Sequence, residues 1–271
     1  FIDYFQKNYF INLFNKSSTP FKKIKAIFHL GACTNTSEKN GDYLYENNYL
    51  YSKKLFKFSI NNKIPFIYAS SASVYGVGKK GFKENIDCES PINNYAFSKF
   101  LFDKYVERHK KKIKSQIVGL RYFNVFGPGE GHKINMFSAP YKFFKQCQNT
   151  NRIDLFKGTD GYKNGDQERD FIYVNDCVNI KKWFLENKKF SGIFNVGTGK
   201  TTSFNDLANF TFKYLKKKNN IQYIEVPEIL KDIYQSYTKA DISKYNLINK
   251  NFRFTNTING LKKYYDFLIK N

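Results

Sequence analysis

The sequence contains few of the residues that build metal centres or disulfide scaffolds. Its four cysteines and three histidines lie far apart and show no metal-ligand spacing, so we expect no metal. The cysteines are Cys33, Cys88, Cys147 and Cys177. Scattered thiols suit a reducing compartment, and we predict a cytoplasmic protein. No run approaches the roughly 18 uninterrupted apolar residues of a membrane helix, and no signal peptide is visible, so we expect no membrane partner.

Acidic residues are also scarce. Lys and Arg number 45 against 23 Asp and Glu, which gives a net charge of +22. A charge of this size invites a nucleic-acid interpretation. However, the chain is rich in Lys, Asn, Ile, Phe and Tyr, which share AT-rich codons, and its lysines are spread along the chain. We therefore expect no nucleic acid as the main partner, while a basic surface would help to attract an anionic substrate.

The order of apolar segments predicts strands that alternate with helices. Apolar runs of strand length cover 24–29, 64–69, 116–121, 169–174, 193–196 and 221–226. Helices are predicted over 1–14, 42–62, the segment from Tyr95, 136–148, the segment capped by Asp176, the segment from Ser203 to about 217, and 257–268. Residues 157–168 are polar and rich in glycine, which predicts a surface loop. This alternation predicts an α/β fold with a doubly wound, Rossmann-type parallel sheet.

Three stretches with small or polar side chains follow predicted strands. Gly31, Ser71 and Asn124 each come directly after, or shortly after, an apolar run. In open parallel sheets, ligands bind beyond the carboxyl ends of the strands, near the point where the strand order reverses. We therefore expect these three stretches to meet at one ligand site.

Tyr95-x-x-x-Lys99 opens a predicted helix, preceded by Pro91 and Asn93. Positions four apart share one face of a helix, so the phenol and the ammonium point the same way. A nearby fixed positive charge favours the phenolate and lowers the tyrosine pKa from about 10. The pair is thus a candidate acid/base unit for alcohol–carbonyl interconversion. The alternative is an exposed tyrosine and lysine on an ordinary helix, a spacing that occurs by chance in a chain with 21 tyrosines.

Several segments together resemble the extended short-chain dehydrogenase/reductase family of nucleotide-sugar enzymes. They are 70–76 (SSASVYG), Tyr95-x-x-x-Lys99, 121–128 (RYFNVFGP) and 169–176 (RDFIYVND). Five more segments narrow the resemblance to the epimerases that act on an ADP-heptose: 28–33, 47–52, 95–103, 129–133 (GEGHK) and 191–195. The resemblance covers essentially the whole chain. It implies epimerisation at C6″ through a transient carbonyl, with tightly bound NADP, or less readily NAD, as cofactor. It also implies a homo-oligomer, by family resemblance a pentamer.

The resemblance assigns roles by position. Tyr95 and Lys133 would be the two acid/base groups, Ser71 would hydrogen-bond the reacting sugar oxygen, and Lys99 would hold the cofactor ribose. The cofactor positions are Leu30, Gly31, Ala32, Cys33, Thr34, Asn47, Lys99, Val125 and Lys133. The substrate positions are Ser71, Asn124, Asn135, Lys142, Phe156, Lys157, Gly158, Thr159, Arg169 and Tyr234. An arginine suits a diphosphate, which it can bind through two parallel hydrogen bonds.

The chain departs from the family pattern in two ways. Leu30, Asn135 and Lys142 stand where relatives usually have an acidic residue, a serine and a histidine, respectively. Nothing matches the glycine-rich turn that follows the first strand in relatives and binds the cofactor pyrophosphate. The first residue is Phe, so we expect an N-terminally incomplete sequence whose first β-α-β segment is missing. The expected domains are 1–127 with 171–200 for the dinucleotide, and 128–170 with 201–271 for the substrate.

Three alternatives remain at this stage. A UDP-hexose 4-epimerase shares the serine, tyrosine and lysine but lacks the 129–133 segment. A dTDP-sugar 4,6-dehydratase needs an acidic pair after the serine strand, where this chain has Ala72, Ser73 and Val74. A non-catalytic scaffold or a basic RNA-binding protein would be expected if the missing segment is truly absent. Sequence-tolerant RNA binding with a steep salt dependence would support that last alternative.

Overall fold

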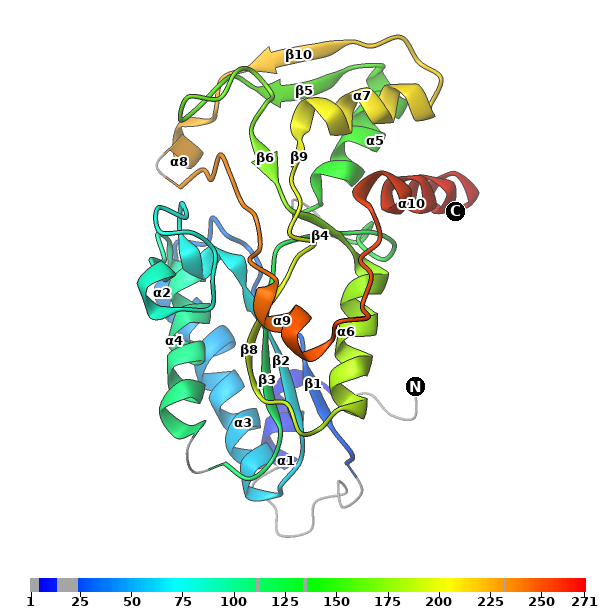
Figure 1. Ribbon diagram of the computed structural model, residues 1–271. Helices are drawn as coiled ribbons and strands as arrows, with labels where there is room; N and C mark the ends of the chain where they lie inside the picture. Colours follow the sequence, from blue (N-terminus) through cyan, green and yellow to red (C-terminus); the bar gives the residue numbers. More distant parts are fainter. Residues whose placement is uncertain (1–4, 14–23, 111–112, 134–135, 232) are drawn as a thin grey trace.

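The computed structural model describes residues 5–13, 24–110, 113–133, 136–231 and 233–271. Two groups of elements lie one above the other in Figure 1, and the chain passes between them several times. Among the described residues, no helix combines the length and the apolarity needed to cross a bilayer.

The lower group is built on a four-stranded parallel sheet in the order β1-β2-β3-β8. Its strands are β1 (Ile27–His29), β2 (Phe66–Ser71), β3 (Ile117–Tyr122) and β8 (Gly192–Val196). Helices α3 (Tyr51–Asn61) and α4 (Asn94–His109) cover one face, and α6 (Val174–Glu186) covers the other (Figure 1). Successive residues of β2 serve the two faces: Phe66 packs with Phe56 and Phe102, while Ile67 packs with Phe184. The doubly wound parallel sheet is confirmed.

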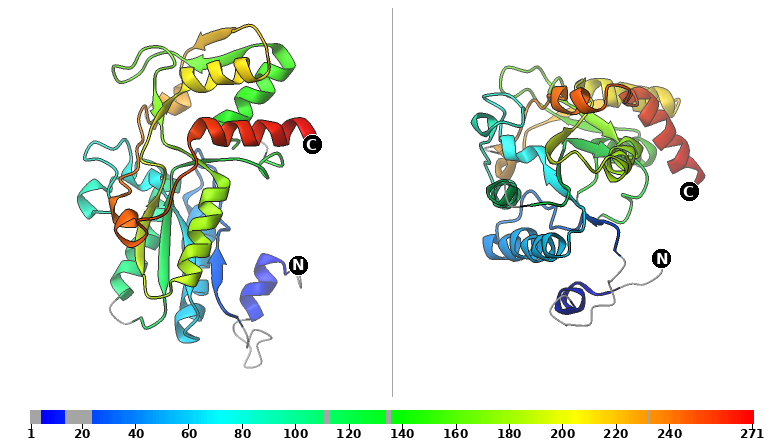
Figure 2. Two further views of the ribbon diagram at one scale, coloured as in Figure 1. Left: turned by 45° about the vertical axis from the view of Figure 1, so that its right-hand side comes forward. Right: turned by 60° about the horizontal axis from the view of Figure 1, so that its bottom comes forward.

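The upper group has its own apolar core. Strands β5 (Ile153–Phe156) and β10 (Ile221–Ile224) pair in parallel, and α5 (Ala139–Thr150), α7 (Phe204–Tyr214) and α10 (Thr257–Lys270) pack beside them. Figure 2 shows α10 beneath this pair of strands and close to the end of α6. Phe144, Leu207 and Tyr265 lie in the centre of the core.

Four short strands connect the two groups. β4 (Asn124–Phe126) pairs in parallel with β7 (Phe171–Tyr173), and β6 (Glu168–Arg169) pairs in antiparallel fashion with β9 (Thr202–Ser203). Helix α9 (Ser243–Ile248) then returns to the sheet, where its Tyr245 packs in the same core as Phe184. The domain boundaries given above stay a prediction. Helix α9 falls within the residues expected for the substrate domain, but it packs on the sheet of the expected dinucleotide domain.

The remaining helices are short. They are α1 (Lys7–Leu13), α2 (Gly41–Leu44), the π-helix η1 (Tyr45–Leu50), the 3₁₀-helices η2 (Ala72–Tyr75) and η3 (Ile86–Cys88), and α8 (Glu228–Lys231). The helix predicted over 42–62 is therefore present as α2, η1 and α3 in succession. Of the helix predicted over 1–14, residues 1–4 and 14 lie outside the described part of the chain.

At two buried carboxylates the structure differs from the local predictions, which were wrong at Asp176 and largely correct around Asp170. Asp176 does not cap α6, whose N-cap is Tyr173; instead it accepts hydrogen bonds from the amide and hydroxyl of Thr255. The strand predicted over 169–174 is confirmed for most of its length, as the end of β6 and all of β7, but it is interrupted at Asp170 and Val174 already begins α6. The Asp170 carboxylate accepts hydrogen bonds from the backbone amides of Thr198, Gly199 and Ala240. In contrast, the predicted cap of α7 is confirmed, since Ser203 accepts from the amide of Asp206.

Candidate active site

Ser71 and Tyr95 meet at the carboxyl end of the central strand β2. β2 ends at Ser71, whose hydroxyl oxygen accepts a hydrogen bond from the backbone amide of Ser73 and so caps the start of η2. Helix α4 begins after Asn93, whose side chain accepts the amide of Ala96, and this places Tyr95 in its first turn. Both Ser71 and Tyr95 are buried, and Ser71 lies close enough to the Tyr95 phenol to lower its pKa. The two residues predicted to act on the same sugar oxygen are thus side by side.

Lys99 lies one turn further along α4 and is also buried. Its ammonium donates to the carbonyl oxygen of Ala69 at 3.0 Å, which ties α4 to β2. Burial lowers the pKa of Lys99 to about 8, and the nearby Asp103 and Cys33 act in the opposite direction. An ammonium has three donors, and Ala69 takes one of them.

The expected lowering of the Tyr95 pKa is wrong for the protein alone. Burial removes water from the phenol and raises its pKa, while the nearby Ser71 lowers it and Cys33 raises it further. The Lys99 ammonium, one turn away, was expected to lower the pKa of Tyr95, but it donates to the carbonyl oxygen of Ala69. Desolvation therefore outweighs the charge.

The loop after β1 is held against α4 by Asn48. The side chain of Asn48 accepts the Cys33 amide at 2.8 Å and donates to the Cys33 carbonyl at 3.0 Å. It also donates to the hydroxyl of Ser98, which in turn donates to the carbonyl of Tyr95. Asn47 was the predicted cofactor residue; its amide donates to Tyr43 and its oxygen accepts from Lys7. Sequence reasoning missed Asn48, the buried neighbour that joins the predicted cofactor loop to Tyr95.

Most of the other predicted cofactor positions lie in the loop after the carboxyl end of β1, and Val125 lies in β4. Leu30 is 45% exposed, and Gly31 has open space where a side chain would stand. Ala32 is partly buried and Thr34 is exposed. Val125, in β4, is partly buried against the core shared by the sheet and α6. The loop after β1 is thus open enough for a ligand to approach its backbone.

Arg169 is the centre of a second cluster in the upper group. It is only 6% exposed, and its guanidinium lies 5.5 Å from the ring centre of Phe204 and 5.2 Å from that of Tyr234. Tyr234 also contacts Phe156 edge to face, with ring centres 5.4 Å apart. Burial lowers the Arg169 pKa. In the part of the chain that the structure describes, Arg169 has no carboxylate partner, only the Glu168 carbonyl.

A cavity of about 280 Å³ adjoins this cluster and is lined by Lys157, Gly158, Thr159 and Tyr234 among others. Thr159 hydrogen-bonds to Ser236 at 2.6 Å, whereas Lys157 is exposed and pairs with Glu225. Of the predicted substrate positions, Phe156 to Thr159 and Arg169 therefore come together around Tyr234.

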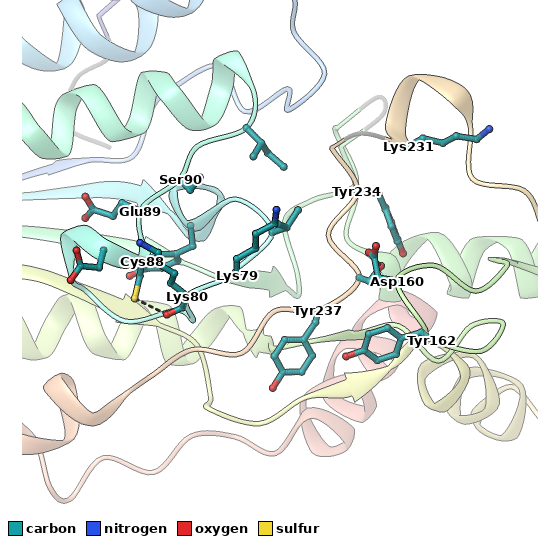
Figure 3. Close-up of a pocket in the computed structure, with 15 residues that line it drawn as sticks. Lys79, Lys80, Cys88, Glu89, Ser90, Asp160, Tyr162, Lys231, Tyr234 and Tyr237 are labelled. Carbon is teal, nitrogen blue, oxygen red and sulfur yellow. Dashed lines mark hydrogen bonds between the residues drawn. The ribbon is translucent and has the colours of Figure 1, made fainter.

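A larger cleft of about 790 Å³ shares Tyr234 with this cavity. Figure 3 shows Lys79 and Lys80 on one side of the cleft, and Asp160 and Tyr234 on the other. The cleft thus lies between the loop that precedes α4 and the upper group.

Three further predicted positions are less closely gathered. Lys133 and Lys142 are exposed, on the turn before α5 and on α5 itself. Asn124 is partly buried, and its amide donates to Thr238 and to the Asp170 carbonyl. Asn135 lies outside the described residues.

A buried charge network under the site was not predicted. Asp103 is fully buried and accepts hydrogen bonds from Tyr68, Ser70 and Arg121, each at 2.9 Å. Arg121 also pairs with Glu89. The only sequence signal was a charged residue inside an apolar strand, which requires a buried partner. The network fixes α4 on β2 and β3, and therefore fixes Tyr95 and Lys99 relative to Ser71.

The chain is similar to known proteins over most of its length. The model of the NAD dependent epimerase/dehydratase family matches residues 11–197. The chain is 43% identical over 264 residues to an ADP-L-glycero-D-manno-heptose-6-epimerase from Alkalilimnicola ehrlichii, covering 97% of this chain and 82% of the relative. It is 42% identical to the protein of the same name from Brachyspira hyodysenteriae, covering 100% of this chain and 84% of the relative.

Solved structures give the same picture. The crystal structure of the Helicobacter pylori ADP-L-glycero-D-manno-heptose-6-epimerase matches with a TM-score of 0.78 and 29% identity, over 90% of this chain and 72% of that one. A UDP-N-acetylglucosamine 4-epimerase from Methanobrevibacter ruminantium matches with a TM-score of 0.80 and 26% identity, over 91% and 77% of the two chains. From its sequence, its parallel sheet and these matches, the chain belongs to the NAD dependent epimerase/dehydratase family.

Proposed function

We propose that the protein interconverts the C6″ epimers of ADP-glycero-D-manno-heptose, converting the D-glycero to the L-glycero form for lipopolysaccharide core biosynthesis. The observation that carries the proposal is the buried contact of Ser71 with Tyr95, one turn from Lys99, at the end of β2. The names of the relatives that are 42–43% identical support the choice of substrate. A cytoplasmic location and a pentameric assembly stay predictions from the resemblance.

The chain's residues fit a nicotinamide dinucleotide, for which we propose NADP rather than NAD. Gly31 leaves open space above the loop after β1, and the buried Lys99 has donors to spare for a ribose. A UDP-glucuronic acid 4-epimerase from Bacillus cereus, 25% identical to this chain, was solved with NAD. When bound, the nicotinamide would accept a hydride from C6″ and return it.

The residues of the lower group would control the proton of the C6″ hydroxyl. Tyr95 takes this proton as the alcohol of one epimer becomes a carbonyl, and it returns a proton only when that same epimer is formed again. Ser71 hydrogen-bonds to the same oxygen and orients it. Because burial raises the pKa of Tyr95, the Lys99 ammonium must compensate by stabilising the phenolate.

Inversion requires the carbonyl to present both faces to the same hydride source. A carbonyl that turns by half a rotation moves its oxygen away from Tyr95, so a second acid/base group is needed on the other side. We assign this role to Lys133, on the turn before α5, following the family resemblance.

Arg169 would bind the diphosphate of the substrate. A buried guanidinium that has no carboxylate partner in the described part of the chain is costly unless an anion neutralises it. Its faces are covered by Phe204 and Tyr234, so its edge remains for an anion. Phe156 and Thr159 border the same region and would contact the remainder of the nucleotide sugar.

The test uses the full-length natural protein and each purified C6″ epimer of ADP-heptose. We expect either epimer to give the same mixture of the two by NMR, with no added oxidant or reductant. UDP-glucose serves as the counter-substrate, because a related solved structure is a UDP-sugar 4-epimerase. Conversion of UDP-glucose without conversion of ADP-heptose would refute the proposed substrate.

A further inference from the structure

Glu130 is a buried carboxylate in the turn that carries Lys133. It is only 5% exposed. One carboxylate oxygen accepts the Ser138 amide at 2.7 Å, and the other accepts the Ser138 hydroxyl at 2.7 Å and the Tyr264 hydroxyl at 2.9 Å. Ser138 is the N-cap of α5, and Tyr264 lies on α10. Glu130 therefore joins the turn to two helices that are far apart in the sequence.

No cation pairs with Glu130 among the residues that the structure describes. A buried carboxylate loses its hydration, and this cost is large unless hydrogen bonds replace the water. Here three hydrogen bonds and the amino end of α5 stabilise the negative charge. Tyr264 responds to this charge, since burial and Glu130 both raise its pKa. Such fully satisfied buried networks fix one conformation.

Lys133 is attached directly to this anchor. Its backbone amide donates to the carbonyl oxygen of Glu130 at 3.1 Å, which closes a turn of four residues. Gly129, just before the anchor, has a φ of +94°, a conformation that side chains rarely adopt. The side chain of Lys133 is exposed. The backbone of Lys133 is thus held while its ammonium stays free to reach a ligand.

We propose that Glu130 is a positioning residue for Lys133. By clamping the turn to Ser138 and Tyr264, it holds the lysine where it can exchange a proton with one of the two orientations of the substrate carbonyl. The inference rests on the proposed function, and in particular on Lys133 as the second acid/base group. It assigns a role to the glutamate of the 129–133 segment, which the proposed chemistry does not otherwise use.

The test is single-turnover reduction of the bound nicotinamide by each epimer, followed by absorbance in the full-length enzyme. One epimer is oxidised with Tyr95 as base and the other with Lys133. We expect Glu130→Gln to slow reduction by the Lys133-dependent epimer on the order of tenfold to a hundredfold, since misplacement by about 1 Å costs this much. Reduction by the other epimer should change by no more than about twofold. Equal slowing of both epimers would overturn the proposal, because general damage to the fold has no preference between them.

A double substitution separates positioning from a direct effect. Lys133→Met identifies the epimer that depends on Lys133. If Glu130 acts through Lys133, adding Glu130→Gln to Lys133→Met causes no further slowing with that epimer. Full additivity of the two effects would contradict the inference.

Milder variants keep the test open if Glu130→Gln does not fold. Tyr264→Phe and Ser138→Ala each remove one hydrogen bond to Glu130 and should show the same epimer preference to a smaller degree. Absence of any preference in both would overturn the proposal. If neither epimer reduces the bound nicotinamide of the unmodified enzyme, the proposed function itself is wrong. Failure of the proposed function is therefore distinguishable from failure of the role proposed for Glu130.

Discussion

At the scale of single residues, Tyr95 is buried, lies beside Ser71 and has the Lys99 ammonium one helix turn away. Replacing Tyr95 by Phe removes only the hydroxyl, so packing at the start of α4 is preserved. We expect turnover to fall by at least about a hundredfold, the contribution typical of a general acid/base, with the free energy of unfolding little changed. Steady-state kinetics and urea unfolding measure the two effects.

Phe97, an exposed neighbour on the same helix turn, provides the matched control. Phe97→Ala should leave turnover near normal. Near-normal turnover of the Tyr95→Phe variant would contradict its assignment as the proton-exchanging group.

The lowered pKa of Lys99 leads us to expect that cofactor binding depends on pH. Its pKa in the folded protein is about 8, below the ordinary value of 10.5, so its ammonium is lost as pH rises through about 8. If this ammonium holds the ribose, affinity for the dinucleotide should weaken over the same range. Calorimetric titration at several pH values measures this. Lys57→Gln, at an exposed lysine of α3, should keep the wild-type profile; an affinity that stays constant across pH 8 would refute the role.

The same shift has a consequence for stability. Between about pH 8 and 10.5 the unfolded chain binds a proton at Lys99 that the folded chain does not. The cost of burying the ammonium is therefore fully present below pH 8 and disappears as pH rises toward 10.5. The contribution of Lys99 to the free energy of unfolding should become more favourable across this window.

Removing the charge of Arg169 should selectively weaken binding of the nucleotide sugar. Arg169→Met keeps an apolar stem between Phe204 and Tyr234 but removes the charge. A charge-assisted hydrogen bond contributes about 1.5–3 kcal/mol, so we expect KM for the nucleotide sugar to rise on the order of tenfold to a hundredfold. Arg169→Lys should not restore affinity, because an ammonium lacks the planar fork.

Arg152 offers the matched control, since its guanidinium is half-exposed and pairs with Asp154. Arg152→Met should leave KM unchanged. An Arg169→Met variant with normal KM would show that the diphosphate binds elsewhere.

At the scale of elements, the amino end of α7 tests how local sequence sets a helix. Ser203 accepts the amide of Asp206 at 3.0 Å and donates to its carboxylate at 2.7 Å. Ser203→Ala removes the cap and should destabilise the protein by about 1 kcal/mol in urea unfolding. Ser203→Thr keeps a hydroxyl and should cost a few tenths of this. Equal effects of the two substitutions would mean that the cap contributes nothing.

The elements themselves could be predicted where the pattern was local. Apolar runs of strand length gave β2, β3 and β8, and the Ser203–Asp206 pair gave the start of α7, because these signals depend on neighbours in sequence. Asn48 could not be distinguished from Asn47 in this way. The two asparagines lie in the π-helix η1, which changes the angular spacing of side chains, so the inward-facing member is set by that irregular turn.

The pKa of Tyr95 shows a second limit of the sequence. Spacing on the helix was correct, but the extent of burial depends on β2 and on the loop after β1, which are remote in sequence. The cap expected at Asp176 failed for the same reason, because its partner Thr255 is 79 residues away. Contacts of this kind follow from the assembled fold.

At the scale of the whole molecule, two clusters of candidate site residues lie on different elements. Ser71, at the end of β2, and Tyr95 and Lys99, on α4, lie at the end of the sheet, while Arg169 of β6 lies beside Tyr234. A cleft of about 790 Å³, lined by Tyr234 and by the loop before α4, lies between the groups. We propose that a nucleotide sugar bound between the groups places its sugar at Tyr95 and its diphosphate at Arg169.

The central claim is that this arrangement inverts a carbon by oxidising it and then reducing it. The most direct measurement uses ADP-heptose labelled with deuterium on C6″, the full-length enzyme and ordinary water. If the hydrogen leaves and returns as hydride within the site, NMR of the inverted product should show the deuterium retained on C6″. Loss of the label to solvent would mean that the carbon is deprotonated instead, and would contradict the account.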